Sequence, residues 1–130
     1  MNESEIQQRI QIEGPRFNCQ LLRNNSGAFR DAEGRFVFFG LGNISKKHSD
    51  RIKSSDLIGF TRIVVTPDMV GRTVAIFTAV EVKASDWADG KKFNAREEAQ
   101  ATFIDWIRKA GGFAGFANSI ESFKRIIGVI

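Results

Sequence analysis

The chain contains few of the residues from which disulfides, zinc clusters and histidine-based active sites are built. Of its 130 residues, one is cysteine, one is histidine, two are proline and none is tyrosine. The single Cys19 excludes an internal disulfide and a cysteine zinc cluster. Because His48 is the only histidine, a histidine metal site or a Ser-His-Asp triad would depend on that one side chain.

Long hydrophobic runs are also missing. No apolar run approaches the length of a membrane span, and the polar N-terminus is not a signal peptide. We therefore expect a cytoplasmic protein that is not secreted and has no membrane partner. A hydrophobic fraction of 42% and a charged fraction of 26% over 130 residues are typical of one soluble globular domain, residues 1–130.

The net charge of +4 favours a polyanionic partner, although only mildly. The basic residues are unevenly distributed, since one segment rich in Ser, Asn and Gly holds Lys46, Lys47, His48, Arg51 and Lys53. We expect a mobile loop suited to phosphate contacts. The simpler interpretation of such a segment is a solvated surface loop.

Hydrophobic periodicity and turn residues predict a mixed β-sheet flanked by helices, and therefore an α/β fold. We expect helices over 3–13, 95–110 and 118–127, and strands over 17–23, 35–39, 57–65, 73–83 and 113–117. Capping boxes at Asn94 with Glu97 and at Asn118 with Glu121 mark two of the helix starts. The apolar stripe of the helix over 95–110 is formed by Ala99, Phe103, Trp106, Ile107 and Ala110, and Gln100 shares it.

Asp56 and the run 79–83 together have the form Asp…Glu-x-Lys. Alternation along the run predicts a strand that directs Glu81 and Lys83 to one face while Val80 and Val82 point inward. Asp56 comes directly before another apolar strand. A solvent-facing alternation would explain Glu81 and Lys83 equally simply. Charged residues on so apolar a strand favour pairing or metal binding instead.

Hydrolysis of a phosphodiester requires a polarised phosphoryl oxygen and an activated water, which Mg²⁺ or Mn²⁺ can supply. The oxygen ligands would be Asp56, Glu81 and the backbone carbonyl of Val82. Lys83 would orient the water or offset charge in the transition state. Gln100 would hold a metal-bound water or a phosphate, or it would satisfy a backbone group. Glu3 is a candidate third acidic residue, in preference to Glu5.

Several runs together resemble the virus-type replication-repair nuclease (VRR-NUC) domain of the PD-(D/E)xK nuclease superfamily. The runs are 23–29, 34–37, 54–59, Glu81-Val82-Lys83, Gln100 and 111–117. The resemblance implies a restriction-endonuclease-like core and a divalent metal bound by Asp56 and Glu81. It assigns the catalytic lysine to Lys83, support to Gln100 and the N-terminal glutamate to Glu3. It also implies a homodimer that cleaves branched DNA such as Holliday junctions in replication, repair or recombination, as in stand-alone phage and bacterial members.

Two other functions remain open alongside the nuclease. A non-catalytic DNA-binding module on the same fold would need no metal, and a structural protein with a basic surface would neither bind nor cleave DNA. The candidate DNA contacts are Arg23, Asn25, Arg30, Arg35, Lys46, Lys47, Arg51, Lys53 and Ser55.

Overall fold

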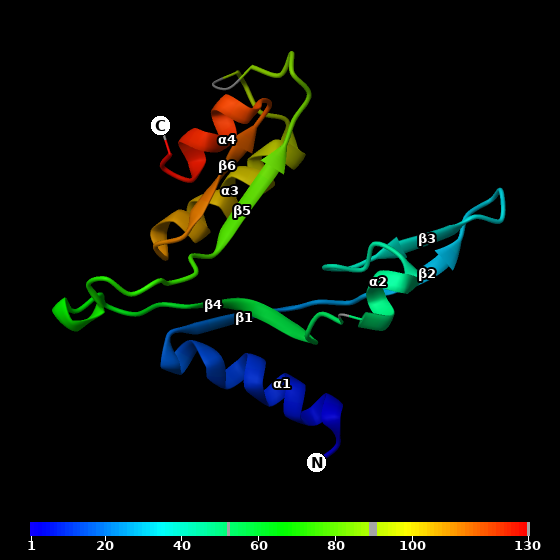
Figure 1. Ribbon diagram of the computed structural model, residues 1–130, viewed down its shortest axis with the longest axis horizontal. Coiled ribbons are helices and arrows are strands. Elements are labelled where there is room, and N and C mark those ends of the chain that lie inside the picture. The colour runs from blue at the N-terminus through cyan, green and yellow to red at the C-terminus, as the bar shows by residue number, and fades with distance from the viewer. Residues whose placement is uncertain (52, 89–90, 130) are drawn as a thin grey trace. The chain divides into compact units, whose positions relative to one another are not determined.

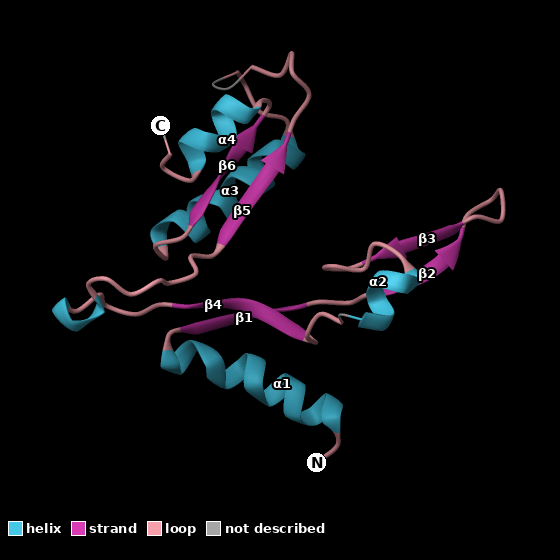
Figure 2. Cartoon of the chain, viewed as in Figure 1, coloured by secondary structure: helices cyan, strands magenta, loops and turns pink. Residues whose placement is uncertain are grey.

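The computed structural model describes residues 1–51, 53–88 and 91–129, without the side chains of residues 48 and 49. It divides into two compact units, Met1–Ile63 and Val64–Ile130, and each is described by itself (Figure 1). Both units combine helices with small sheets, which confirms the α/β class (Figure 2). No described helix has the length and apolar character needed to cross a membrane.

The first unit consists of a helix beside a pair of antiparallel strands, together with a β-hairpin and a second, short helix. Its elements are α1 (Glu3–Glu13), the 3₁₀ helix η1 (Gly14–Phe17), β1 (Cys19–Arg23), β2 (Gly27–Arg30), β3 (Phe36–Phe39), α2 (Lys46–Arg51) and β4 (Leu57–Thr61). β1 pairs with β4 and β2 pairs with β3, both antiparallel. A Cβ at Gly59 would overlap the carbonyl oxygen of Gln20, so close pairing of β1 with β4 requires glycine there.

The second unit is a βαβ crossover followed by a short helix. Its elements are η2 (Pro67–Met69), β5 (Thr78–Val82), α3 (Ala95–Lys109), β6 (Phe113–Ala117) and α4 (Ile120–Ile126). β5 pairs with β6 in parallel, with α3 as the connection that parallel strands need. The core of this unit is small: Ile107 is fully buried, and Ile104, Ala114 and Ala117 are nearly so.

The strands do not join into the single mixed sheet that the sequence predicts. Within the described residues they form three two-stranded sheets. The strands expected over 57–65 and 73–83 are shortened to Leu57–Thr61 and Thr78–Val82. Their partners β1 and β6 have only five residues each, and a single backbone hydrogen bond continues the pairing beyond the end of β4, from Arg62 to Asn18, and beyond the end of β5, from Lys83 to Ala117.

Three other expectations need correction. The basic segment expected as a loop contains the helix α2, and the strand β2 was missed. The last helix is capped by Ser119, whose Oγ accepts from the backbone N–H of Ser122 over 3.1 Å, and not by Asn118. The Asn118 amide instead donates to the carbonyl of Trp87 over 2.8 Å. In contrast, the capping box of Asn94 with Glu97 is confirmed.

Candidate active site

In the second unit, Glu81, Lys83 and Gln100 are joined side chain to side chain. Lys83 Nζ donates a hydrogen bond to Gln100 Oε1 over 2.8 Å. Gln100 Nε2 donates to Glu81 Oε1, also over 2.8 Å. Because an amide can accept at its oxygen and donate at its nitrogen simultaneously, one glutamine fixes both the carboxylate and the amine. Gln100 is therefore a partner of the Glu-x-Lys pair in this structure.

The strand β5 presents these groups to α3. Glu81 and Lys83 are partly buried, whereas Val82 is 74% exposed, so the expectation that Val82 points inward is wrong. The cause is that α3 covers the face of β5 that carries Glu81, as the bond from Gln100 shows. The opposite face of the sheet contains Gly115, which lies against Ile126 of α4.

Glu97 is a charged site residue that the sequence analysis used only as a helix cap. It is 5% exposed, and Trp87 Nε1 donates to its Oε2 over 2.6 Å. The same oxygen lies 3.9 Å from Lys83 Nζ and 4.0 Å from Lys91 Nζ. Its other oxygen accepts from the backbone N–H of Asn94 over 3.2 Å, which completes the capping box.

These contacts lower the pKa of Glu97 below the ordinary 4.5 of a glutamate. The largest cause is the hydrogen bond from the Trp87 indole, followed by the bond from the Asn94 backbone, since both stabilise the carboxylate form. Burial opposes this shift, and the ammonium groups of Lys91 and then Lys83 add to it. Glu97 is thus held as a carboxylate beside the amine of Lys83.

The periodicity of α3 contained the signal that would have identified Glu97. Gln100, Ile104 and Ile107 follow it by three, seven and ten residues, which places all four on one helix face. Ile104 and Ile107 are buried, while Phe103, placed in the predicted stripe, is 37% exposed. The buried face is therefore rotated from the predicted one, and Glu97 lies at its N-terminal end.

Asp56 belongs to the first unit, where Asn24 anchors the segment that precedes β4. The backbone N–H of Asn24 donates to the carbonyl of Asp56 over 2.9 Å. Its amide donates to Ser54 Oγ over 2.8 Å and to the carbonyl of Ser55 over 2.9 Å. The carboxylate of Asp56 is exposed and stands directly before β4, as the sequence predicts. That Asp56 and Glu81 share one metal site stays a prediction, because the two residues lie in separate units.

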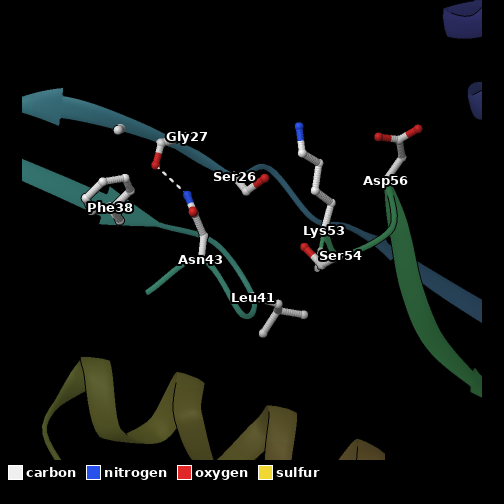
Figure 3. Close-up of a pocket in the computed structure, with 9 residues that line it drawn as sticks. Ser26, Gly27, Phe38, Leu41, Asn43, Lys53, Ser54 and Asp56 are labelled. Carbon is white, nitrogen blue, oxygen red and sulfur yellow. Dashed lines mark hydrogen bonds between the residues drawn. The ribbon is translucent and has the colours of Figure 1, made fainter. Parts of the chain in front are cut away.

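Asp56 also borders a pocket of about 410 Å³ within the first unit (Figure 3). The lining comes from the start of the hairpin, the segment after it and the residues before β4: Ser26, Gly27, Ala28, Phe38, Leu41, Asn43, Lys53, Ser54 and Asp56. Asn43 shapes this pocket by donating to the carbonyls of Gly27 and Phe39 over 2.7 and 2.9 Å. Sequence reasoning found Asp56 and Lys53 but not the pocket.

Glu3 and Glu5 have different environments at the start of α1. Glu5 completes a capping box, accepting from the Asn2 backbone over 3.0 Å while its own N–H donates to Asn2 Oδ1 over 2.9 Å. Glu3 precedes Gln7 by four residues and so shares its partly buried face. Gln11, one turn later, donates to the carbonyl of Leu21 in β1 over 3.4 Å. The N-terminal end of α1 lies on the side of the antiparallel pair β1–β4 where β4 begins (Figure 1).

The candidate DNA contacts all fall in the first unit, mostly exposed, on four segments. Arg30 and Arg35 flank the tip of the hairpin β2–β3, where Asp31 and Glu33 hold the Arg35 guanidinium at 3.0 and 3.3 Å. The other candidates lie at the end of β1 and just after it, in α2 and before β4: Arg23, Asn25, Lys46, Lys47, Arg51, Lys53 and Ser55.

Two of the sequence-predicted metal ligands are carboxylates, the type of group that Mg²⁺ and Mn²⁺ prefer, and they lie in different units. Glu81 supplies a carboxylate in the second unit and Asp56 supplies one in the first, and such cations bind through one or two carboxylates plus water and substrate phosphate. Within the described residues, no three His, Cys, Asp or Glu side chains gather closely enough to hold a metal ion. Any metal site would thus combine few protein ligands with water or substrate oxygens.

Comparison with protein-family models, with curated proteins and with solved structures found no match to this chain.

Proposed function

We propose that the chain is a divalent-metal-dependent endodeoxyribonuclease that hydrolyses phosphodiester bonds in branched DNA on a PD-(D/E)xK core. The observation that carries this proposal is the pair of 2.8 Å hydrogen bonds by which Gln100 joins Glu81 to Lys83. A carboxylate and an amine fixed side by side on one strand are the groups that this chemistry requires. A solvent-facing alternation would not fix them through a helix side chain.

Each residue has a role in this proposal. Glu81 and Asp56 would hold Mg²⁺ or Mn²⁺, with the Val82 carbonyl and Glu3 as further ligands. The bound cation would polarise a phosphoryl oxygen and lower the pKa of a water. Lys83 would orient the attacking water and offset negative charge on the phosphate. Gln100 and Glu97 would hold Lys83 in place.

The test is a cleavage panel of four-way junction, flap, splayed-arm, duplex and single-stranded DNA, each with Mg²⁺, Mn²⁺ or EDTA. We expect metal-dependent cleavage of the branched substrates, and its loss in Asp56→Ala, Glu81→Gln and Lys83→Met. Lys109→Met is the matched control, because Lys109 is exposed at the far end of α3 and pairs with Asp105. Activity retained in Asp56→Ala would refute the assignment. DNA binding without cleavage by the unmodified chain would instead support the non-catalytic module.

Within the same proposal the active form is a homodimer. Symmetric cutting of a junction on two strands needs two active sites related by a two-fold axis, and one chain offers one candidate site. Sedimentation at micromolar concentration is the measurement. A monomeric profile, with and without junction DNA, would argue against the dimer.

A further inference from the structure

The hairpin β2–β3 has two chemically different faces. In an antiparallel pair, residues directly opposite one another share a face, and the register pairs Arg30 with Phe36 and Ala28 with Phe38. These four residues form what we call the Phe36 face. The other pairs, Phe29 with Val37 and Gly27 with Phe39, form the Phe29 face.

The Phe36 face combines an exposed aromatic ring with a guanidinium group. Arg30 Cζ lies 4.2 Å from the centroid of the Phe36 ring, and Phe36 is 59% exposed. The centroid of the Phe38 ring lies 6.3 Å from that of the Phe36 ring, and the two ring planes are tilted by 34°. A guanidinium group over an exposed aromatic ring, with a second, partly buried ring next to it, is a combination on which unpaired nucleobases stack.

The same face leads into the pocket described above. Phe38 and Ala28 line that pocket on the hairpin side, and Lys53, Ser54 and Asp56 line it on the other (Figure 3). Its volume of about 410 Å³ lies within the range of pockets that hold small organic groups. A ligand that crosses the Phe36 face therefore meets apolar ring surface first, then a pocket with an ammonium group and hydroxyls at its edge.

We infer that the Phe36 face binds an unpaired stretch of DNA, stacking one base on Phe36 beside Arg30 and admitting its neighbour to the pocket at Phe38. This inference rests on the proposed function, because it names the part of a branched substrate that lies next to Asp56. The cations complement the phosphate backbone, and the rings need bases whose faces are free. An intact duplex hides those faces within its stack, so it does not fit this surface.

The experiment measures binding of the full chain in EDTA, by fluorescence anisotropy of a labelled single-stranded DNA at fixed salt. Phe36→Ala should raise the Kd about tenfold, the effect of removing one base–aromatic stack. Phe29→Ala is the matched control, because Phe29 is 53% exposed on the opposite face of the same hairpin. Its Kd should stay within twofold of the unmodified chain. Phe36→Trp should restore binding.

Three further probes identify what is recognised. With an oligonucleotide of abasic sites, the difference between Phe36→Ala and the unmodified chain should disappear. Arg30→Lys keeps the charge but removes the planar guanidinium, so it should weaken binding to intact bases more than to abasic ones. A blunt duplex should bind with no dependence on Phe36, and an RNA of the same sequence tests the preference for DNA.

An equal loss in Phe29→Ala, or a Phe36 effect that persists on abasic DNA, would overturn the inference. Concentration-dependent self-association removed by either change would show that the hairpin contacts a second copy instead, which also overturns it. Circular dichroism of each variant checks that the fold is retained, and Phe36→Trp keeps the test valid if the alanine variant unfolds. Because EDTA prevents cleavage, stacking can be found without nuclease activity, and cleavage can be found without stacking.

Discussion

Trp87 Nε1 donates a hydrogen bond to Glu97 Oε2 over 2.6 Å, which links the segment after β5 to the first turn of α3. The centroid of the Trp87 ring also lies 5.0 Å from that of Phe116 and 6.2 Å from that of Phe93. The tryptophan thereby packs against β6 while it anchors a carboxylate. Glu97 in turn lies 3.9 Å from Lys83 Nζ, so Trp87 and Glu97 together contact the candidate site at Lys83.

The lowered pKa of Glu97 predicts how acid affects the second unit. A carboxyl whose pKa is lower in the folded than in the unfolded chain binds fewer protons when folded. Its stabilisation is therefore complete above the ordinary value of 4.5 and is lost as the pH falls through the lower folded value. Thermal unfolding measured from pH 7 to pH 3 should show this loss. Glu97→Gln should flatten that part of the profile, and an unchanged profile in the variant would contradict the assignment.

Removing the bridge at Gln100 should reduce activity without unfolding the chain. In Gln100→Ala, Glu81 and Lys83 lose their shared partner, and we expect cleavage to fall about 10- to 100-fold, the usual effect of losing a residue that orients a site. Gln100→Glu should be at least as harmful, since it places a second carboxylate against Glu81. Single-turnover cleavage rates measure the effect.

The control for this bridge is Glu98→Ala, two residues earlier on the exposed side of α3. It should retain the cleavage rate of the unmodified chain. Equal losses in Glu98→Ala and Gln100→Ala would mean that α3 as a whole is disturbed and that Gln100 has no particular role.

Asn24 should control the position of Asp56. Asn24→Ala removes the amide that donates to Ser54 Oγ and to the carbonyl of Ser55, so the segment before β4 loses two of its anchors. We expect a loss in unfolding free energy of about 1–3 kcal/mol. We also expect half-maximal cleavage to require a higher Mn²⁺ concentration, because the proposed ligand Asp56 is less well positioned. Urea denaturation and a Mn²⁺ titration of activity measure the two effects. Asn25→Ala, at the exposed neighbouring position, should weaken DNA binding and leave the stability unchanged.

Gly59 should tolerate no side chain. In Gly59→Ala the added methyl group meets the carbonyl of Gln20 in the paired strand, and overpacking against backbone costs about 1–3 kcal/mol or more. Urea denaturation should show this loss. For comparison, the methyl group added in Gly34→Ala has no atom within 4 Å, and the only penalty is the strain of a φ of +80°. Gly34→Ala should therefore lower the free energy of unfolding by less. Equal costs at the two positions would contradict the close strand contact.

Local sequence signals predicted most helices and the existence of the strands β5 and β6, but not where strands end or which strands pair. α1 follows from its apolar spacing and from Gly14, which ends it, and α3 follows from the cap at Asn94 and from Gly111, which comes just after it. The limits of β4 and β5 depend on how far a partner strand runs, which is a property of the pair and absent from either sequence alone. β2 was missed because Gly27 and Ala28 have low strand propensity, and pairing with β3 overrides it.

The candidate site was predictable where it depends on one strand and one helix face. Gln100 was expected on the buried helix face, holding a metal-bound water or a phosphate or satisfying a backbone group, whereas its side chain forms hydrogen bonds with Glu81 and Lys83. Glu97 was overlooked because a capping role already explained it. Its hydrogen-bond partner Trp87 lies outside the helices and strands that the sequence predicts. The predicted inward direction of the Val82 side chain was wrong. Alternation shows which residues share a face of a strand, but it does not show which face a helix will cover.

The crossover from β5 through α3 to β6 has a consequence for how the second unit assembles. Glu81 and Gln100 are 19 residues apart in sequence, and Trp87 and Glu97 are 10 apart. Because chain-closure entropy rises only with the logarithm of loop length, contacts over such short separations form at small entropic cost. This half of the candidate site can therefore assemble while residues before Val64 are still unstructured. In a pulsed hydrogen-exchange experiment, the amides of β5 and β6 should gain protection together.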